Sequence, residues 1–218
     1  MGHPFHPDDF PLNTDVILQP TKIFYLKGCI HFKQTAQILD LSGRVSSLFT
    51  GDFNHAWLDE AEQVARKLSQ SSSPSYEIKS SGNMMRTLKT ITDGSGGKVC
   101  DLNITFVSFG SSTVRFPKDS PHSRHEIELC PVGGRSSGED SKHEAFVKNS
   151  IPYFWDMTRG RVGILYKCLN QKRVEIGRVA GYGFDKDAVI ALNGNELDDV
   201  VAISTCIILL NGRDAMDA

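Results

Sequence analysis

The sequence has little of what marks secreted or membrane-spanning proteins. Its longest apolar run, residues 200–210, is about half as long as the ~20 residues that a transmembrane helix needs. The first residues, MGHPFHPDDF, contain no apolar core typical of a signal peptide. The five cysteines are odd in number and include no CxxC pair, unlike a disulfide framework. We therefore expect a cytoplasmic protein without a transmembrane segment.

Strong charge imbalance and metal-ligand spacing are also missing. The formal net charge is -2 at pH 7, whereas a nucleic-acid-binding domain carries a clustered basic excess. His122 and His125 are a close pair of histidines, but no Cys or His partner stands near them at zinc spacing. These absences predict no nucleic-acid partner, no metal and no cofactor.

Familiar catalytic motifs are absent as well. The chain has no GxSxG elbow, no P-loop and no GxGxxG after a strand. Its adjacent acidic pairs, such as Asp59-Glu60 and Asp198-Asp199, stand where helix capping or a solvated face explains them. The sequence therefore favours a non-enzymatic protein and leaves an enzyme as the alternative.

What the chain does contain is a series of strand signals separated by turns. The stretch TKIFYLKGCIHF, residues 21–32, is dense in β-branched and aromatic residues. Three later stretches each place two apolar arms around a turn, which predicts β-hairpins. These turns are at residues 40–43, within 37–49; at 93–97, within 88–109; and at 170–172, within 164–179. The pattern predicts a mainly β protein.

Other segments interrupt this pattern. Residues 54–70 place their apolar side chains on one stripe, which predicts an amphipathic helix. Residues 133–145 carry too little apolar surface to favour an ordered structure, and we interpret them as a mobile loop. We expect a single domain over residues 21–212, preceded by an extended leader (1–20) and followed by a short tail (213–218).

The apolar run near the end of the chain indicates how the sheet is arranged. Asn195 can cap a helix and Asn211-Gly212 can end it, whereas the many β-branched residues between them favour a strand. The stretch between Asn195 and Asn211 is long for a strand and of ordinary length for a helix, so we predict a helix. A helix that is apolar all round must be enclosed, and the surrounding sheet is the available cover. We therefore predict a closed antiparallel β-barrel around a central C-terminal helix, with a core of Val200, Ile203, Cys206, Ile207 and Leu210.

This arrangement resembles the tubby C-terminal superfamily, and within it the LURP-one-related branch. The resemblance rests on FYLKGCIHFKQTAQILDLSGRVSSLF, MMRTLKTITDGSGGKVCDL and GFDKDAVIALNGNELDDVVAISTCIILL. Asp40 and Gly43 match the first family turn, Asp93 matches the second, and Gly194 with Asp198 or Asp199 matches the approach to the helix. The helix at 54–70 and the loop at 133–145 depart from the family pattern.

The resemblance implies a β-barrel threaded by its last helix, and association with membranes. Tubby proteins bind membrane phosphoinositides through basic barrel residues, and related scramblase-like proteins act at membranes. Basic residues near the last hairpin of this chain suit the same ligand: Arg159, Arg161, Lys167, Lys172 and Arg173. With the hairpin folded, they can form one cationic edge for a phosphate headgroup. The alternative is that these are ordinary polar residues of a hairpin tip and a sheet edge.

The aromatic run Tyr153-Phe154-Trp155 leaves two interpretations open. As a strand it turns alternate side chains outward, into an exposed ridge or beneath a covering segment. The leading functional hypothesis is a non-enzymatic binding or adaptor module, peripheral at a membrane through phosphoinositide or another anionic lipid, or bound to a protein partner. The alternative is a small enzyme or ligand-sequestering barrel with a cavity between strands and central helix.

Overall fold

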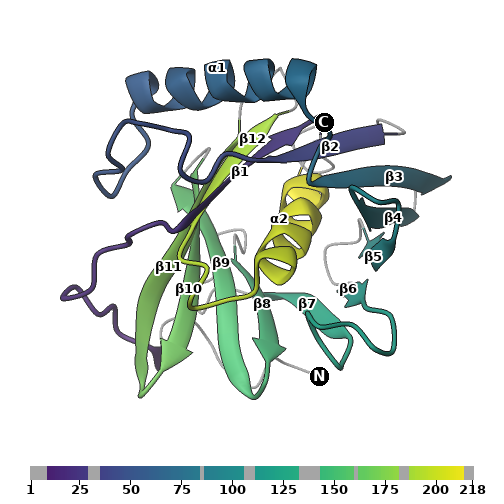
Figure 1. Ribbon diagram of the computed structural model, residues 1–218. Helices are drawn as coiled ribbons and strands as arrows, with labels where there is room; N and C mark the ends of the chain where they lie inside the picture. The colour runs from purple at the N-terminus through teal and green to yellow at the C-terminus, as the bar shows by residue number, and fades with distance from the viewer. Residues whose placement is uncertain are drawn as a thin grey trace.

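The computed structural model describes residues 9–28, 35–83, 86–105, 111–132, 143–159, 162–181 and 187–213. Within these residues it contains twelve strands and two helices (Figure 1): β1 (Lys22–Lys27), β2 (Thr35–Asp40), α1 (His55–Ser71), β3 (Tyr76–Asn83), β4 (Arg86–Asp93), β5 (Lys98–Thr105), β6 (Ser112–Arg115), β7 (Ile127–Val132), β8 (His143–Lys148), β9 (Ile151–Arg159), β10 (Val162–Leu169), β11 (Lys172–Gly181), β12 (Ala188–Leu192) and α2 (Asp199–Arg213).

The strands form a closed antiparallel barrel, as the sequence predicts. Each strand from β2 to β12 pairs with its neighbours in chain order, and β1 closes the barrel by pairing with both β2 and β12. Closure removes the exposed edges that an open sheet would present. The barrel therefore has an inside and an outside, and alternate residues of each strand face one or the other.

Helix α2 fills the inside of the barrel, which confirms the predicted central helix (Figure 1). Every residue from Val200 to Leu210 is buried. The inward-facing strand residues pack around it, among them Phe24, Ile38, Ile91 and Leu165. Because strands surround the helix, it needs no polar face, and this explains why its sequence has no amphipathic period.

Polar side chains of α2 are satisfied inside the core. Thr205 donates its hydroxyl to the carbonyl of Val201 at 2.9 Å and accepts the indole N–H of Trp155 at 3.1 Å. The hydroxyl of Ser204 lies 3.3 Å from the Cys100 thiol. These bonds let a helix with two hydroxyl residues be buried without water.

The start of α2 differs from the sequence prediction, which placed the cap at Asn195. The carboxylate of Asp198 accepts the backbone N–H groups of Val200 at 3.0 Å and Val201 at 3.2 Å, so Asp198 is the N-cap. A carboxylate there also balances the positive end of the helix dipole. The predicted stop at Asn211 is likewise too early, because α2 continues to Arg213.

Two of the three predicted hairpins are confirmed. Strands β4 and β5 pair across the turn after Asp93, whose carboxylate accepts the N–H groups of Ser95 and Gly97. Strands β10 and β11 pair across Asn170-Gln171.

The hairpin predicted at residues 37–49 is wrong. Its turn exists, with Gly43 at φ +71°, but the chain after it forms no strand, and β2 pairs with β3 instead.

Helix α1 explains why that hairpin does not form. The predicted amphipathic helix is confirmed at His55–Ser71 and covers the outer wall of the barrel (Figure 1). Trp57 and Ala61 pack on Tyr25 and Leu39 of β1 and β2, and Phe49 packs against the same cluster. The apolar residues after the turn therefore cover the outside of the sheet beside α1 and do not extend it.

The N-terminal segment also lies on the barrel wall. Residues 1–8 lie outside the described part of the chain, but Leu12 pairs in parallel with Arg173 of β11. Phe10 packs on the outer cluster around Phe154 and Tyr166, and Leu18 is buried. Most of the loop predicted at 133–145 lies outside the described residues, and its last three residues begin β8.

Substitution of Ile207 tests the role of α2. Ile207→Asp should abolish the cooperative fold, because an unpaired buried charge costs more than the ~5–15 kcal/mol that holds a typical domain together. Ile207→Val, which removes one methylene, should cost only about 1 kcal/mol. Thermal melting followed by circular dichroism distinguishes the two. A sharp transition of the aspartate variant near the wild-type midpoint would contradict a central helix.

Substitution of Asp198 tests the helix cap. Asp198→Ala should lower the free energy of unfolding by about 1–2 kcal/mol, because two amide groups lose their acceptor. Asp198→Asn keeps an acceptor of similar capping strength and should retain most of the stability. Urea denaturation of both variants provides the measurement. Equal losses in the two variants would show that charge, and not capping, is what Asp198 contributes.

Candidate functional site

The five basic residues predicted as one cationic edge do not lie together. In the register, Arg159 pairs with Val162 at one end of β10, and Lys172 pairs with Leu169 at the other. Seven residue steps separate these ends, which is about 23 Å along a strand. Arg161 and the side chain of Arg159 lie outside the described part of the chain. The strands thus hold Arg159 far from Lys172.

Lys167 has a partner of its own. Its ammonium group lies 2.8 Å from the carboxylate of Glu196, in the loop that leads into α2. The Lys167 side chain is only 16% exposed. Its charge is therefore balanced within the protein.

Arg173 anchors the N-terminal segment to the barrel. Its guanidinium lies over the rings of Tyr166 and Phe154, at 5.2 and 5.9 Å from their centroids. Its backbone N–H donates to the carbonyl of Pro11, and its carbonyl accepts the N–H of Asn13. Stacking of this kind stabilises a partly buried guanidinium. Arg173 therefore has a structural role that sequence reasoning missed.

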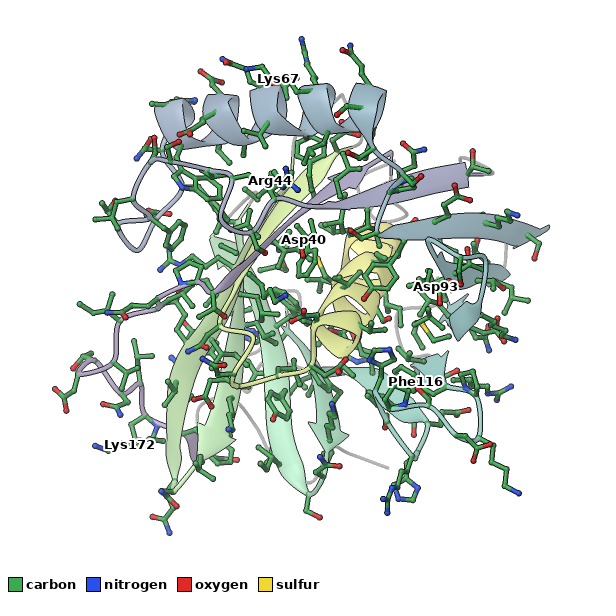
Figure 2. The ribbon with its side chains drawn as sticks, viewed as in Figure 1. Asp40, Arg44, Lys67, Asp93, Phe116 and Lys172 are labelled. Carbon is green, nitrogen blue, oxygen red and sulfur yellow. The ribbon has the colours of Figure 1, made fainter. Side chains whose placement is uncertain are left out.

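Lys172 remains exposed, and it belongs to a larger feature that we call the hairpin rim. Figure 1 shows the β8–β9 and β10–β11 hairpins ending at the same end of the barrel, and Figure 2 shows Lys172 there. The hairpin rim consists of Leu12, Val147, Lys148, Leu169 and Lys172. Three of these are large apolar side chains with unusual exposure: Leu12 (41%), Val147 (45%) and Leu169 (48%).

The strand register brings the hairpin rim together. Lys148 pairs with Ile151 across one hairpin, and Leu169 pairs with Lys172 across the other. The two hairpins are adjacent because β9 pairs with β10. Neighbouring strands are about 4.8 Å apart, so Lys148 and Lys172 stand about 14 Å apart across the rim.

Tight turns keep these side chains at the very end of the barrel. Asn149, Ser150, Asn170 and Gln171 all have positive φ, between 52° and 63°. Two consecutive residues of this kind form the two-residue turn that suits the twist of a hairpin. The sequence signals Asn149-Ser150 as a turn between apolar arms, so this hairpin was open to prediction. Nothing in the sequence indicates the position of Leu12.

The electrostatics of the rim are not uniformly positive. Burial lowers the pKa of Lys148, and the nearby Asp198 carboxylate acts in the opposite direction. Asp198 also lies 3.1 Å from Nδ1 of His122. His122 therefore contacts the N-terminus of α2. Among the residues that the structure describes, no three His, Cys, Asp or Glu side chains are grouped to hold a metal ion.

The two interpretations of the aromatic run are resolved in favour of burial. Tyr153 and Trp155 face the core, and Trp155 contacts α2. Phe154 faces outward but is fully buried beneath Phe10 and the side chains beside it. The run therefore offers no exposed ridge.

The alternative hypothesis concerns the barrel interior, towards which the carboxyl group of Glu144 is directed. Glu144 is two residues before Phe146 and pairs with Trp155, both of which face the core, so its side chain shares the inner face. Burial raises the pKa of Glu144 to about 7. Three hollows lined by described residues measure about 360, 210 and 370 Å³, and none of these three is lined by a residue of α2.

Comparisons with known proteins establish no family. No family model matches the sequence, and no curated protein matches it. A solved protein of Arabidopsis thaliana is similar in structure, with 14% sequence identity and a TM-score of 0.43, over 88% of this chain and 91% of that one. No helix built from described residues is long and apolar enough to cross a membrane.

The pKa of Glu144 generates a pH-dependent prediction. Its pKa in the folded state lies above the ordinary value of 4.5, so the folded protein binds the proton more tightly and loses stability as pH rises from about 4.5 to 7. Glu144→Gln removes this cost. It should raise the free energy of unfolding at pH 8 by about 1–3 kcal/mol and change it little near pH 4.5. Denaturation midpoints of both proteins across this range provide the measurement. A benefit that is the same at both pH values would show that ionisation of Glu144 is not responsible.

Proposed function

We propose that this chain is a non-enzymatic binding module with a tubby-like fold, which docks peripherally on anionic phospholipid through the hairpin rim. The observation that carries the proposal is the exposure of Leu12, Val147 and Leu169 at the end of the barrel where Lys172 is also exposed, with Leu169 directly opposite Lys172 in the register. Large apolar side chains are usually covered. Several of them at one end of the barrel, together with a cation, suit a membrane surface, where acyl chains lie beneath anionic headgroups.

The proposed contact has two physical parts. Leu169 and Val147 stand beside tight turns, where they can reach the boundary between headgroups and acyl chains. Lys172 would then meet the phosphate layer, where one lysine contributes about 1 kcal/mol. Because the rim provides few cations, and an acidic residue lies near Lys148, binding is weak and sensitive to salt.

The family resemblance supports the same ligand class. The turns at Asp40 and Asp93, followed by the helix in the barrel, resemble the pattern of the tubby-like and LURP-one-related proteins, although the turn at Asp40 does not lead into a hairpin here. Tubby proteins bind phosphoinositides, so phosphoinositides are the first anionic lipids to test. In this proposal the protein acts as an adaptor at the cytoplasmic surface of a membrane.

The alternative of an enzyme or ligand-sequestering barrel rests on Glu144 in the interior. A catalytic carboxyl group with a pKa near 7 is suited to proton transfer. The three measured hollows, however, are not lined by α2. The rim proposal has the more direct structural support.

Vesicle sedimentation tests the proposal. The intact protein should bind phosphatidylcholine vesicles that contain phosphatidylinositol bisphosphate at low salt, and release them as salt rises. Lys172→Glu and Leu169→Asn should each weaken binding, because they remove the two parts of the contact. Lys67→Glu is the matched control, since it makes the same charge change on the outer face of α1, far from Lys172 in Figure 2.

Comparison of the three variants separates a specific contact from a general effect of charge. Binding that is equal for the wild type and Lys172→Glu at low salt would overturn the proposed contact. Equal loss in Lys172→Glu and Lys67→Glu would show a nonspecific response to net charge, which also overturns it.

A further inference from the structure

The segment between α1 and β3 presents a serine in a form that enzymes can reach. Ser73 is exposed and is followed by Pro74. Ser72 ends the helix in an extended conformation, with φ −142° and ψ 151°, and a residue before proline is itself restricted to extended conformations. An exposed, extended Ser-Pro dipeptide has the shape and sequence that proline-directed protein kinases accept.

The same serine lines a hollow of about 210 Å³. This hollow lies between the end of α1 and the turn that follows β2. Hydroxyl groups dominate its lining, from Ser42, Ser72 and Ser75 in addition to Ser73. Such a hollow can receive a phosphate group and donate hydrogen bonds to its oxygens.

Arg44 provides the cation of this hollow. It is exposed, and its guanidinium has no ion-pair partner among the residues that the structure describes. Figure 2 shows Arg44 beneath α1, near the turn that contains Asp40. Asp40 also lines the hollow, but its carboxylate accepts the N–H of Ser42 at 2.8 Å and lies 4.0 Å from the ammonium of Lys22. Arg44 is therefore the group there that is available to pair with a new anion.

We propose that Ser73 is a phosphorylation site, and that Arg44 binds the resulting phosphate. A proline-directed kinase would transfer the γ-phosphoryl group of ATP to the Ser73 hydroxyl oxygen. The new O–P bond forms as the bond between the β- and γ-phosphates breaks, ADP leaves, and the hydroxyl proton passes to the base of the kinase. The phosphate then joins the end of α1 to the turn at Arg44.

Arg44 is needed because the phosphate would lie just beyond the C-terminus of α1. A negative charge just beyond a helix C-terminus is unfavourable, and the last turn of α1 contains no basic residue to offset it. The bidentate guanidinium of Arg44 supplies that compensation from a different part of the chain. The proposal involves no residue of the hairpin rim, so it stands or falls separately from the proposed function.

Ser120 is an internal comparator, because it is the first residue of the other Ser-Pro dipeptide, Ser120-Pro121. It is only partly exposed and lies beside a turn in which its N–H donates to the carbonyl of Pro117. Its hydroxyl oxygen accepts the N–H of His122 at 3.2 Å. Two serines with the same sequence motif thus differ in exposure and in the local hydrogen bonds that hold them.

Phosphorylation of the intact chain tests the first half of the proposal. The folded protein is incubated with a mitogen-activated protein kinase and ATP, and the modified residues are mapped by mass spectrometry. We expect phosphate on Ser73, with loss of most incorporation in Ser73→Ala and Pro74→Ala and little change in Ser120→Ala. An unmodified Ser73, or incorporation that is lost in Ser120→Ala instead, would overturn the site.

Phosphorus NMR of the phosphorylated protein tests the second half. The second pKa of phosphoserine is about 6, and a neighbouring guanidinium lowers it by favouring the dianion. We expect the phosphate pKa to rise by roughly half a unit or more in Arg44→Gln, and to stay near the wild-type value in Arg44→Lys. An identical titration in the wild type and Arg44→Gln would show that Arg44 does not bind the phosphate.

Discussion

Burial of a helix with no polar face is the constraint on which the rest of this structure depends. All side chains from Val200 to Leu210 must leave water, and neither a single sheet nor another helix can cover every side of them. A barrel closed by the pairing of β1 with β12 can. The hydroxyl groups of Ser204 and Thr205 find partners within that enclosure, so the helix is stabilised without a solvated stripe.

Closing the barrel around α2 leaves other apolar side chains on the outer wall, and these must also be shielded from water. The strands place some apolar side chains outward, and two added segments cover them. Helix α1 covers Tyr25 and Leu39, and the N-terminal segment covers Phe154 with Phe10. Arg173 joins this second cover to β11 through its backbone and its stacked guanidinium. The outer layers are thus consequences of the same enclosure that buries α2.

The distribution of cations shows which basic side chains the fold already uses and which it leaves exposed to solvent. Lys167 is balanced by Glu196, and Arg173 is stacked on aromatic rings, so neither is a solvated charge at the barrel end. Lys172 stands clear of both at a hairpin tip and shares the rim with exposed apolar residues such as Leu169. An exposed cation beside uncovered apolar surface is a different arrangement from the continuous basic edge that the sequence suggests.

The sequence by itself determined the elements whose signal is local. The turn at Asp93 and the apolar stripe of α1 depend on near neighbours, and the length and uniform apolarity of α2 implied an enclosing barrel. Pairing between distant segments was decided only by the tertiary structure. The segment after Gly43 has the sequence pattern of a strand, but it covers the sheet beside α1. The N-cap of α2 is Asp198 and not Asn195. The hairpin rim likewise unites Leu12 with Lys172, because strand register and a parallel bridge at Arg173 are long-range contacts that leave no local trace in the sequence.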